Sequence, residues 1–241
     1  MNGQSFTDSQ EALAYLQSKY GSANYRSWQS LRKEWWSYVQ YNTAGQNVLN
    51  FFGDAIGQNN TTRQLTNLPK SGSFGQNHFL LKGIRCDYYM ANYEVDNTFV
   101  VDADLVNSDI INGIFQAGVF ELLIGDRVFT QIPKPFLYAP PADGRTQVYA
   151  EGLRALTLAE GTPNTFTSLR TAQPHAELLS RHQSKFIIDP NILIEAEQHF
   201  ECRISYPTGA LATICTNVAN NTTNPMYVGV VLDGIVFRPV Q

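Results

Sequence analysis

The aliphatic run Met226–Gln241 is interrupted only by the dipeptide Asp233–Gly234. An apolar run of this kind at a terminus indicates a buried strand rather than a frayed tail. A second run with the same character, Gly118–Ile132, is centred on the dipeptide Gly125–Asp126 and is followed by several prolines. Together the two runs predict an all-β barrel or sandwich.

Both dipeptides suit the turns of two-residue β-hairpins. Gly125–Asp126 fits a type II′ turn and Asp233–Gly234 fits a type I′ turn. The residues then expected to face each other across the ladders are Leu122 with Phe129 and Val231 with Val236.

The bulk composition excludes several classes of protein. A chain of 241 residues can form one domain or two. Charged residues make up 16% and the net charge is −4, so the sequence has no basic stripe and we expect no sequence-specific nucleic-acid binding. The sequence contains no apolar run long enough for a spanning helix and no secretion signal, which predicts a soluble protein made in the cytosol. The unpaired set Cys86, Cys202 and Cys215 is typical of buried thiols.

The amino-terminal region differs from the rest because its apolar residues recur at helical spacing. Thr7 or Asp8 can cap a first helix that ends at Gly21. A second helix is predicted from Trp28, Leu31, Trp35 and Val39, which fall at positions i, i+3, i+7 and i+11. These patterns predict a helical arm over residues 1–54, a polar linker over 55–73 and a β body over 74–241.

Within the β body, Phe79–Tyr89 is predicted as the first strand, Phe99–Val101 as a short second one, and Ile192–Tyr206 as one long alternating strand. Alternation places Glu195, Glu197 and His199 on one face of that long strand. Two or three of these side chains could hold a divalent ion; the competing interpretation is a charged strand edge, solvated or facing another subunit.

We find no catalytic motif: no nucleophile elbow, no phosphate-binding loop and no cysteine in a known catalytic context. The sequence therefore predicts a protein that is not an enzyme and needs no cofactor. The aromatic stripe on the second predicted helix has two interpretations, a core packed within the chain or an anchor between subunits. The residues concerned are Trp28, Trp35, Trp36 and Tyr38.

Three segments, read in order, resemble the jelly-roll major capsid proteins of tailless, often membrane-containing, bacteriophages. They are Thr66–Leu68 with the glycine-containing step after it, the run GVFELLIGDRVFTQIP with its following prolines, and the final LDGIVFRPVQ. The resemblance implies a jelly-roll β-barrel; chain length favours one barrel over two compact ones. Because consecutive jelly-roll strands mostly lie in opposite sheets, Asp233–Gly234 has a second interpretation as a bulge within one long strand.

The function implied by the resemblance is that of a structural capsid subunit in the virion, synthesised in the host cytoplasm. Its implied partners are other copies of itself in trimers or hexagonal capsomers, other virion proteins and an underlying viral membrane. Two other hypotheses stay open from the residues alone. One is a carbohydrate- or receptor-binding jelly roll, such as a spike or penton-like protein, and the other is a metal-dependent barrel enzyme using Glu195, Glu197 and His199.

Overall fold

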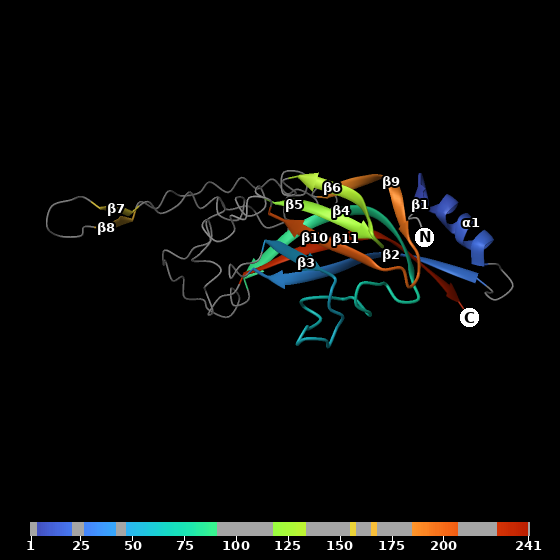
Figure 1. Cartoon of the computed structure of the whole chain (residues 1–241), viewed down its shortest axis with the longest axis horizontal. Coiled ribbons are helices and arrows are strands. Elements are labelled where there is room, and N and C mark those ends of the chain that lie inside the picture. The colour runs from blue at the N-terminus through green and yellow to red at the C-terminus, as the bar shows by residue number, and fades with distance from the viewer. Residues whose placement is uncertain are drawn as a thin grey trace.

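The computed structural model describes residues 4–20, 27–41, 47–90, 118–133, 155–157, 165–167, 185–206 and 226–240. The protein is mainly β, as the sequence predicts, and its strands form two facing antiparallel sheets (Figure 1). Among the described residues, no helix is long and apolar enough to cross a membrane.

The larger sheet contains five strands in the order β1-β9-β4-β11-β2. Strand β11 (Met226–Val240) lies between β4 (His78–Met90) and β2 (Ser27–Gln40). Strands β9 (Phe186–Ile194) and β1 (Gln4–Phe6) complete the sheet beyond β4. Because β11 lies between two other strands and is buried on both of its faces, its sequence is an almost continuous apolar run.

The smaller sheet contains four strands in the order β3-β10-β5-β6. These are β3 (Val48–Phe51), β10 (Phe200–Ser205), β5 (Val119–Ile124) and β6 (Arg127–Pro133). Two further short strands, β7 (Ala155–Thr157) and β8 (Thr165–Thr167), pair only with each other.

The interior between the sheets is apolar and contains a group of aromatic rings in mutual contact. Phe74 lies in the loop before β4, and its ring stacks on Phe200 of β10 at a centroid distance of 4.3 Å. The same ring contacts Trp35 of β2 at 5.1 Å and Phe79 of β4 at 4.8 Å. Phe74 therefore joins the two sheets at one end of the core. The sequence assigned residues 55–73 to a polar linker and Phe74 to the start of the β body. Leu68 and Phe74 are both fully buried, so this segment is part of the core.

Helix α1 (Ser9–Tyr20) forms where the first helix was predicted. The Asp8 carboxylate accepts hydrogen bonds from the N–H groups of Gln10 and Glu11 at 2.7 and 2.8 Å. The Glu11 carboxylate accepts hydrogen bonds from the N–H of Thr7 at 3.2 Å and from the Thr7 hydroxyl at 2.5 Å, so it holds the residue before the N-cap and does not close a capping box with Asp8. The helix packs on the outer face of the five-stranded sheet, burying Ala12 and Leu16 against Leu80, Leu193 and Phe237.

The second predicted helix is wrong: Ser27–Gln40 is strand β2. Leu31, Trp35 and Val39 are spaced by four residues, a spacing that fits one helix face and also one strand face. The strand places Trp35 in the core and Trp36 on the opposite face. Strands β2 and β3, both within the region assigned to a helical arm, are thus parts of the two sheets.

The single long strand predicted over Ile192–Tyr206 is also wrong. It is divided into β9 and β10, which lie in different sheets, by a turn in which Glu197 has a φ of 58°. The alternation holds only in the second half, where Phe200, Cys202 and Ile204 face the core. The predicted strand Phe99–Val101 lies outside the described residues.

The hairpin at Gly125–Asp126 is confirmed, with Gly125 at a φ of 60° as a type II′ turn requires. A bulge shifts the register, so that Leu122 pairs with Thr130 and not with Phe129. The hairpin at Asp233–Gly234 is wrong, and so is the pairing of Val231 with Val236. The alternative of one long last strand is confirmed, but the extra residue of the bulge opposite this dipeptide is Lys82 in β4 and not a residue of β11.

Candidate functional site

The residues predicted to share a metal-binding strand face lie in the turn between β9 and β10. Glu195 and Glu197 belong to separate ion pairs, with Lys19 and Lys70 respectively. The side chain of His199 is exposed at the end of the same turn. Nowhere in the described part of the chain do three or more His, Cys, Asp or Glu side chains gather in a way that could hold a metal ion.

Glu195 instead fixes helix α1 to the sandwich. Its carboxylate accepts hydrogen bonds from Lys19 Nζ at 2.6 and 2.7 Å, from the Tyr20 hydroxyl at 2.6 Å and from the Tyr15 hydroxyl at 3.1 Å. We call these four residues the Glu195 cluster. Burial alone would raise the pKa of Glu195, but the hydrogen bonds from Lys19, Tyr20 and Tyr15 outweigh burial and lower it. Burial and the bond to Glu195 raise the pKa of Tyr20 to about 12.

His78 lies beside this cluster at the start of β4. Its ring centroid is 4.9 Å from that of Tyr20 and 5.6 Å from that of Trp28. His78 Nδ1 accepts a hydrogen bond from the N–H of Ala196 at 3.1 Å. Burial lowers the pKa of His78 to about 4, so the imidazole is neutral near pH 7. The hydrogen bonds of the Glu195 cluster and of His78 all join residues of the same chain, which indicates a structural role for both.

The four aromatic residues proposed as subunit anchors are divided by the strand geometry of β2. Trp35 is 1% exposed and belongs to the core. Trp28 packs with the residues beneath α1. Trp36 and Tyr38 are half-buried on the outer face; Trp36 Nε1 donates a hydrogen bond to the carbonyl of Arg63 at 3.3 Å. Trp35 is therefore excluded as an anchor, while a role for Trp36 or Tyr38 between subunits stays a prediction.

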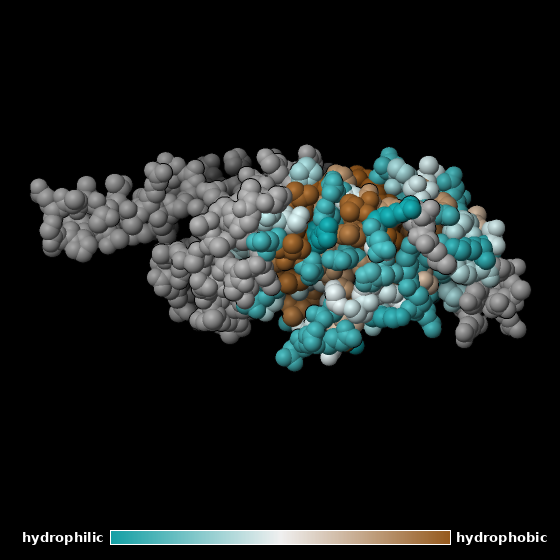
Figure 2. All heavy atoms as spheres, viewed as in Figure 1, coloured by the Kyte–Doolittle hydropathy of each residue, from teal (hydrophilic) through white to brown (hydrophobic). Residues whose placement is uncertain are grey.

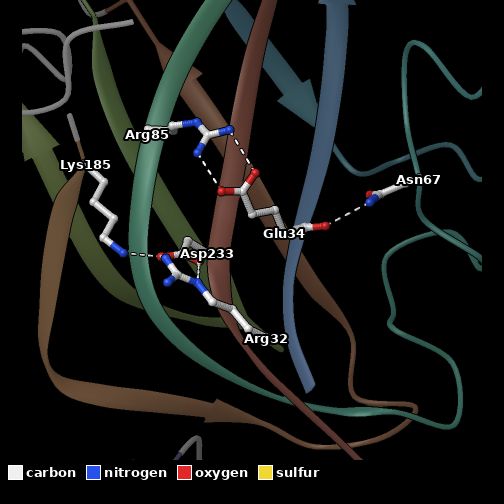
Figure 3. A network of polar contacts seen from close by, with 6 residues as sticks. All are labelled: Arg32, Glu34, Asn67, Arg85, Lys185 and Asp233. Atoms are coloured by element: carbon white, nitrogen blue, oxygen red, sulfur yellow. Dashed lines mark hydrogen bonds and ion pairs between the residues drawn. The ribbon is translucent and has the colours of Figure 1, made fainter. Parts of the chain in front are cut away.

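A charged network on the outer face of the five-stranded sheet was not predicted (Figure 3). Asp233 of β11, opposite the bulge in β4, is 3% exposed and forms ion pairs with Lys185 and Arg32. On the neighbouring strands Arg85 donates two hydrogen bonds to the Glu34 carboxylate, at 2.8 and 3.0 Å. The sequence contained one signal for this network: Asp233 lies within a mostly apolar terminal strand. A buried carboxylate of this kind needs a partner of opposite charge.

The network keeps its central acid ionised. Burial alone would raise the pKa of Asp233, but the hydrogen bond and charge of Lys185, followed by those of Arg32, lower it. Asn67 extends the network at the edge of β2, where its amide donates to the carbonyl of Glu34 at 2.9 Å. Five charged side chains from four parts of the sequence thus bind one another on this face.

The outer face of the four-stranded sheet has a different composition, which the strand register defines. The outward side chains lie in three rows across the sheet. The first row is Val48, Ser205, Val119 and Pro133; the second is Asn50, Arg203, Glu121 and Gln131; the third is Glu201, Leu123 and Val128. A polar row therefore separates two rows that carry the apolar side chains. Val48 and Val128 are 38% and 46% exposed.

The thiols of Cys86 and Cys202 are buried, as the sequence predicts, and Cys215 lies outside the described residues. Burial raises the pKa of the Cys202 thiol, which keeps it protonated and unreactive near neutral pH.

Comparison of the chain with protein-family models, with curated proteins and with solved structures finds no match. The function is therefore argued from the fold and from the surfaces described above.

Proposed function

We propose that this protein is a structural subunit of an icosahedral viral capsid, with one jelly-roll body, and that its activity is self-assembly. The proposal depends first on the order in which strands pair. Strands β1, β7 and β8 are short additions, and the other eight form four antiparallel pairs. In chain order the first pairs with the eighth, the second with the seventh, the third with the sixth and the fourth with the fifth. These pairs are β2 with β11, β3 with β10, β4 with β9 and β5 with β6.

This nested pairing is what a jelly roll requires. A long two-stranded ribbon folds over so that alternate pairs join the same sheet, which gives eight strands in two sheets with Greek-key connections. The contacts of β11 with β4 and of β10 with β5 join the pairs in this way. The pairing order is the single observation that carries the jelly-roll part of the proposal.

Jelly rolls also occur in lectins and cupins, so the fold alone does not select a function. The capsid function is favoured by the sequence resemblance, whose segments have defined places in the sandwich. Residues 66–68 lie against the edge of β2, where Thr66 forms a bridge with Ser37. The run Gly118–Pro133 is the β5–β6 hairpin, and residues 232–240 are the second half of β11.

The test is the assembly state of the purified full-length chain. Light scattering coupled to size exclusion, followed by negative-stain electron microscopy, should show trimers, hexamers or shells that increase with protein concentration. A monomer at every concentration and ionic strength would contradict the proposal. Binding of that monomer to a glycan array would instead support the carbohydrate-binding alternative.

A further inference from the structure

We propose that the outer face of the four-stranded sheet binds the same face of a second copy. The two copies would be related by a twofold axis that lies in the interface and runs parallel to the strands, between β5 and β10. The inference rests on the proposed function and specifies the contact surface and its symmetry, neither of which follows from self-assembly itself.

The composition of this face suits a protein partner. Its three rows contain only three charged residues, Glu121, Glu201 and Arg203, with a sum of charges near zero. Interface centres have few charges, and flat near-neutral surfaces do not attract nucleic acid. Figure 2 shows apolar and polar side chains alternating across the middle of the molecule, where Figure 1 draws the four-stranded sheet.

The middle row holds an ion pair with unused binding capacity. Arg203 Nε donates to Glu121 at 2.6 Å, and the Arg203 side chain stays 36% exposed. The other oxygen of the Glu121 carboxylate accepts from Gln131 Nε2 at 2.6 Å. Glu121 is only 8% exposed and both of its oxygens are already bonded, so the free capacity lies mainly on Arg203, whose guanidinium keeps further N–H donors. The Arg203 guanidinium can therefore bind a second acceptor at the outer rim of this pair.

The arrangement of charge selects a copy of the same face as the partner. Arg203 lies on β10 and Glu121 on the adjacent β5, so the positive and negative groups are on opposite sides of a line between these strands. A twofold axis along that line exchanges β10 with β5 and β3 with β6. Arg203 of each copy then meets Glu121 of the other, Asn50 meets Gln131, and Val48 meets Pro133. Opposite charges thus face each other in the middle row, while the same axis places Ser205 against Val119 and Glu201 against Leu123, so the match is carried by the middle row.

The size of the face predicts a weak contact. Four strands about 4.8 Å apart and three rows of side chains cover roughly 400 Å² in each copy, about half of what a stable interface buries per partner. One such contact would dissociate readily. It would be populated when other contacts hold the same copies together, as in a closed shell, where many weak contacts act at once.

Charge exchange tests the contact with one variant that breaks the Arg203–Glu121 pair and a second that restores it with the charges exchanged. Arg203→Glu alone places like charges across the axis and should weaken association roughly tenfold or more. The double variant Arg203→Glu/Glu121→Arg restores opposite charges both within and between copies. It should associate nearly as well as the wild type. Circular dichroism of both variants checks that each keeps the wild-type fold.

Mixing gives the sharper readout. Labelled wild-type and double-variant chains, dissociated and then allowed to associate together, should separate into two populations, because every contact between them faces like charges. Energy transfer between the labels should fall at least severalfold below that of wild type mixed with wild type. The matched control is Lys70→Glu/Glu197→Lys, which exchanges an exposed ion pair outside this face. This control should mix freely with the wild type.

The two proposals fail in distinguishable ways. If the wild type never associates, the proposed function is wrong. If the wild type assembles but mixes freely with the double variant, or if Arg203→Glu associates as well as the wild type, only the twofold contact through this face is wrong.

Discussion

On the outer face of the five-stranded sheet, Val231, Asp233 and Phe237 of β11 are 2%, 3% and 1% exposed. On the outer face of the four-stranded sheet, Val48 and Val128 are 38% and 46% exposed. Both faces come from the same alternation of side chains along strands. An outward direction therefore does not determine exposure, which depends on what else in the chain reaches that face.

The charged side chains of the two outer faces also differ in how far they are buried and paired within the chain. Asp233 on the five-stranded sheet contacts two basic side chains, and Glu195 near its edge is held by three residues of α1. On the four-stranded sheet Arg203 forms an ion pair with Glu121 and stays partly exposed. The first face uses its polar groups to fix elements of its own chain, whereas the second leaves the Arg203 guanidinium partly exposed.

The substitution with the largest expected effect removes packing from the outer face of the five-stranded sheet, which α1 covers. Phe237→Ala deletes a fully buried ring beneath α1 and should destabilise the protein by about 3–5 kcal/mol. Leu31→Ala, on the opposite face of the neighbouring strand β2, removes a side chain that is 41% exposed and should cost less than about 1 kcal/mol. Urea unfolding of the two variants measures the difference. Equal losses would show that α1 does not cover this face in solution.

The next effect is a pH dependence specific to the covered face. The pKa of His78 is about 4 in the folded protein and 6.5 in the unfolded chain. The unfolded state thus takes up the proton first, so this contribution to stability is complete above pH 6.5 and is lost as the pH falls toward 4. The slope should reach at most about 1.4 kcal/mol for each pH unit.

The variant His78→Asn retains an acceptor for the N–H of Ala196 and removes the titration. Its free energy of unfolding, measured at closely spaced pH values, should be flatter between pH 6.5 and 4. Below that range both proteins should lose stability together, because the lowered carboxyl pKa values of Glu195, Glu121 and Asp233 apply to both. An unchanged slope in the variant would exclude His78 as its cause.

Sequence patterns that depend on near neighbours predicted this molecule well. The cap of α1, strand β4 and the β5–β6 hairpin are each determined within a few residues, and each was found. Strand β2 was missed because a spacing of four residues satisfies both helix and strand periodicity. The pairing of β2 with β11 decides between them, and these segments are far apart in the sequence.

The surfaces were harder to predict for the same reason. The partners of Asp233 come from β2 and from Lys185, and those of Glu195 come from α1. Glu195, Glu197 and His199 alternate as a strand would, but the turn with Glu197 at positive φ sends them in different directions. No local pattern contains the strand pairing and turn geometry that bring such residues together.

The two acidic residues of that turn give a matched test of covered and exposed charge. Glu195→Gln removes a carboxylate that holds Lys19, Tyr15 and Tyr20, and should cost about 1–3 kcal/mol. Glu197→Gln breaks an exposed pair with Lys70 and should cost no more than about 1 kcal/mol. Thermal unfolding, with limited proteolysis of α1 as a second readout, measures both. A larger loss of stability in Glu197→Gln than in Glu195→Gln would contradict the assignment of Glu195 as the covered carboxylate and Glu197 as the exposed one.

The smallest effect compares the same substitution on the two faces. Val→Thr keeps the shape of the side chain and adds a hydroxyl, which is costly where water is excluded. Val231→Thr on the covered face should lose about 1–2 kcal/mol, because the hydroxyl is removed from water. Val128→Thr should change stability by less than about 0.5 kcal/mol, since that side chain is 46% exposed in the single chain. If Val128→Thr costs as much as Val231→Thr in dilute monomer, this face is already covered and cannot receive a second copy.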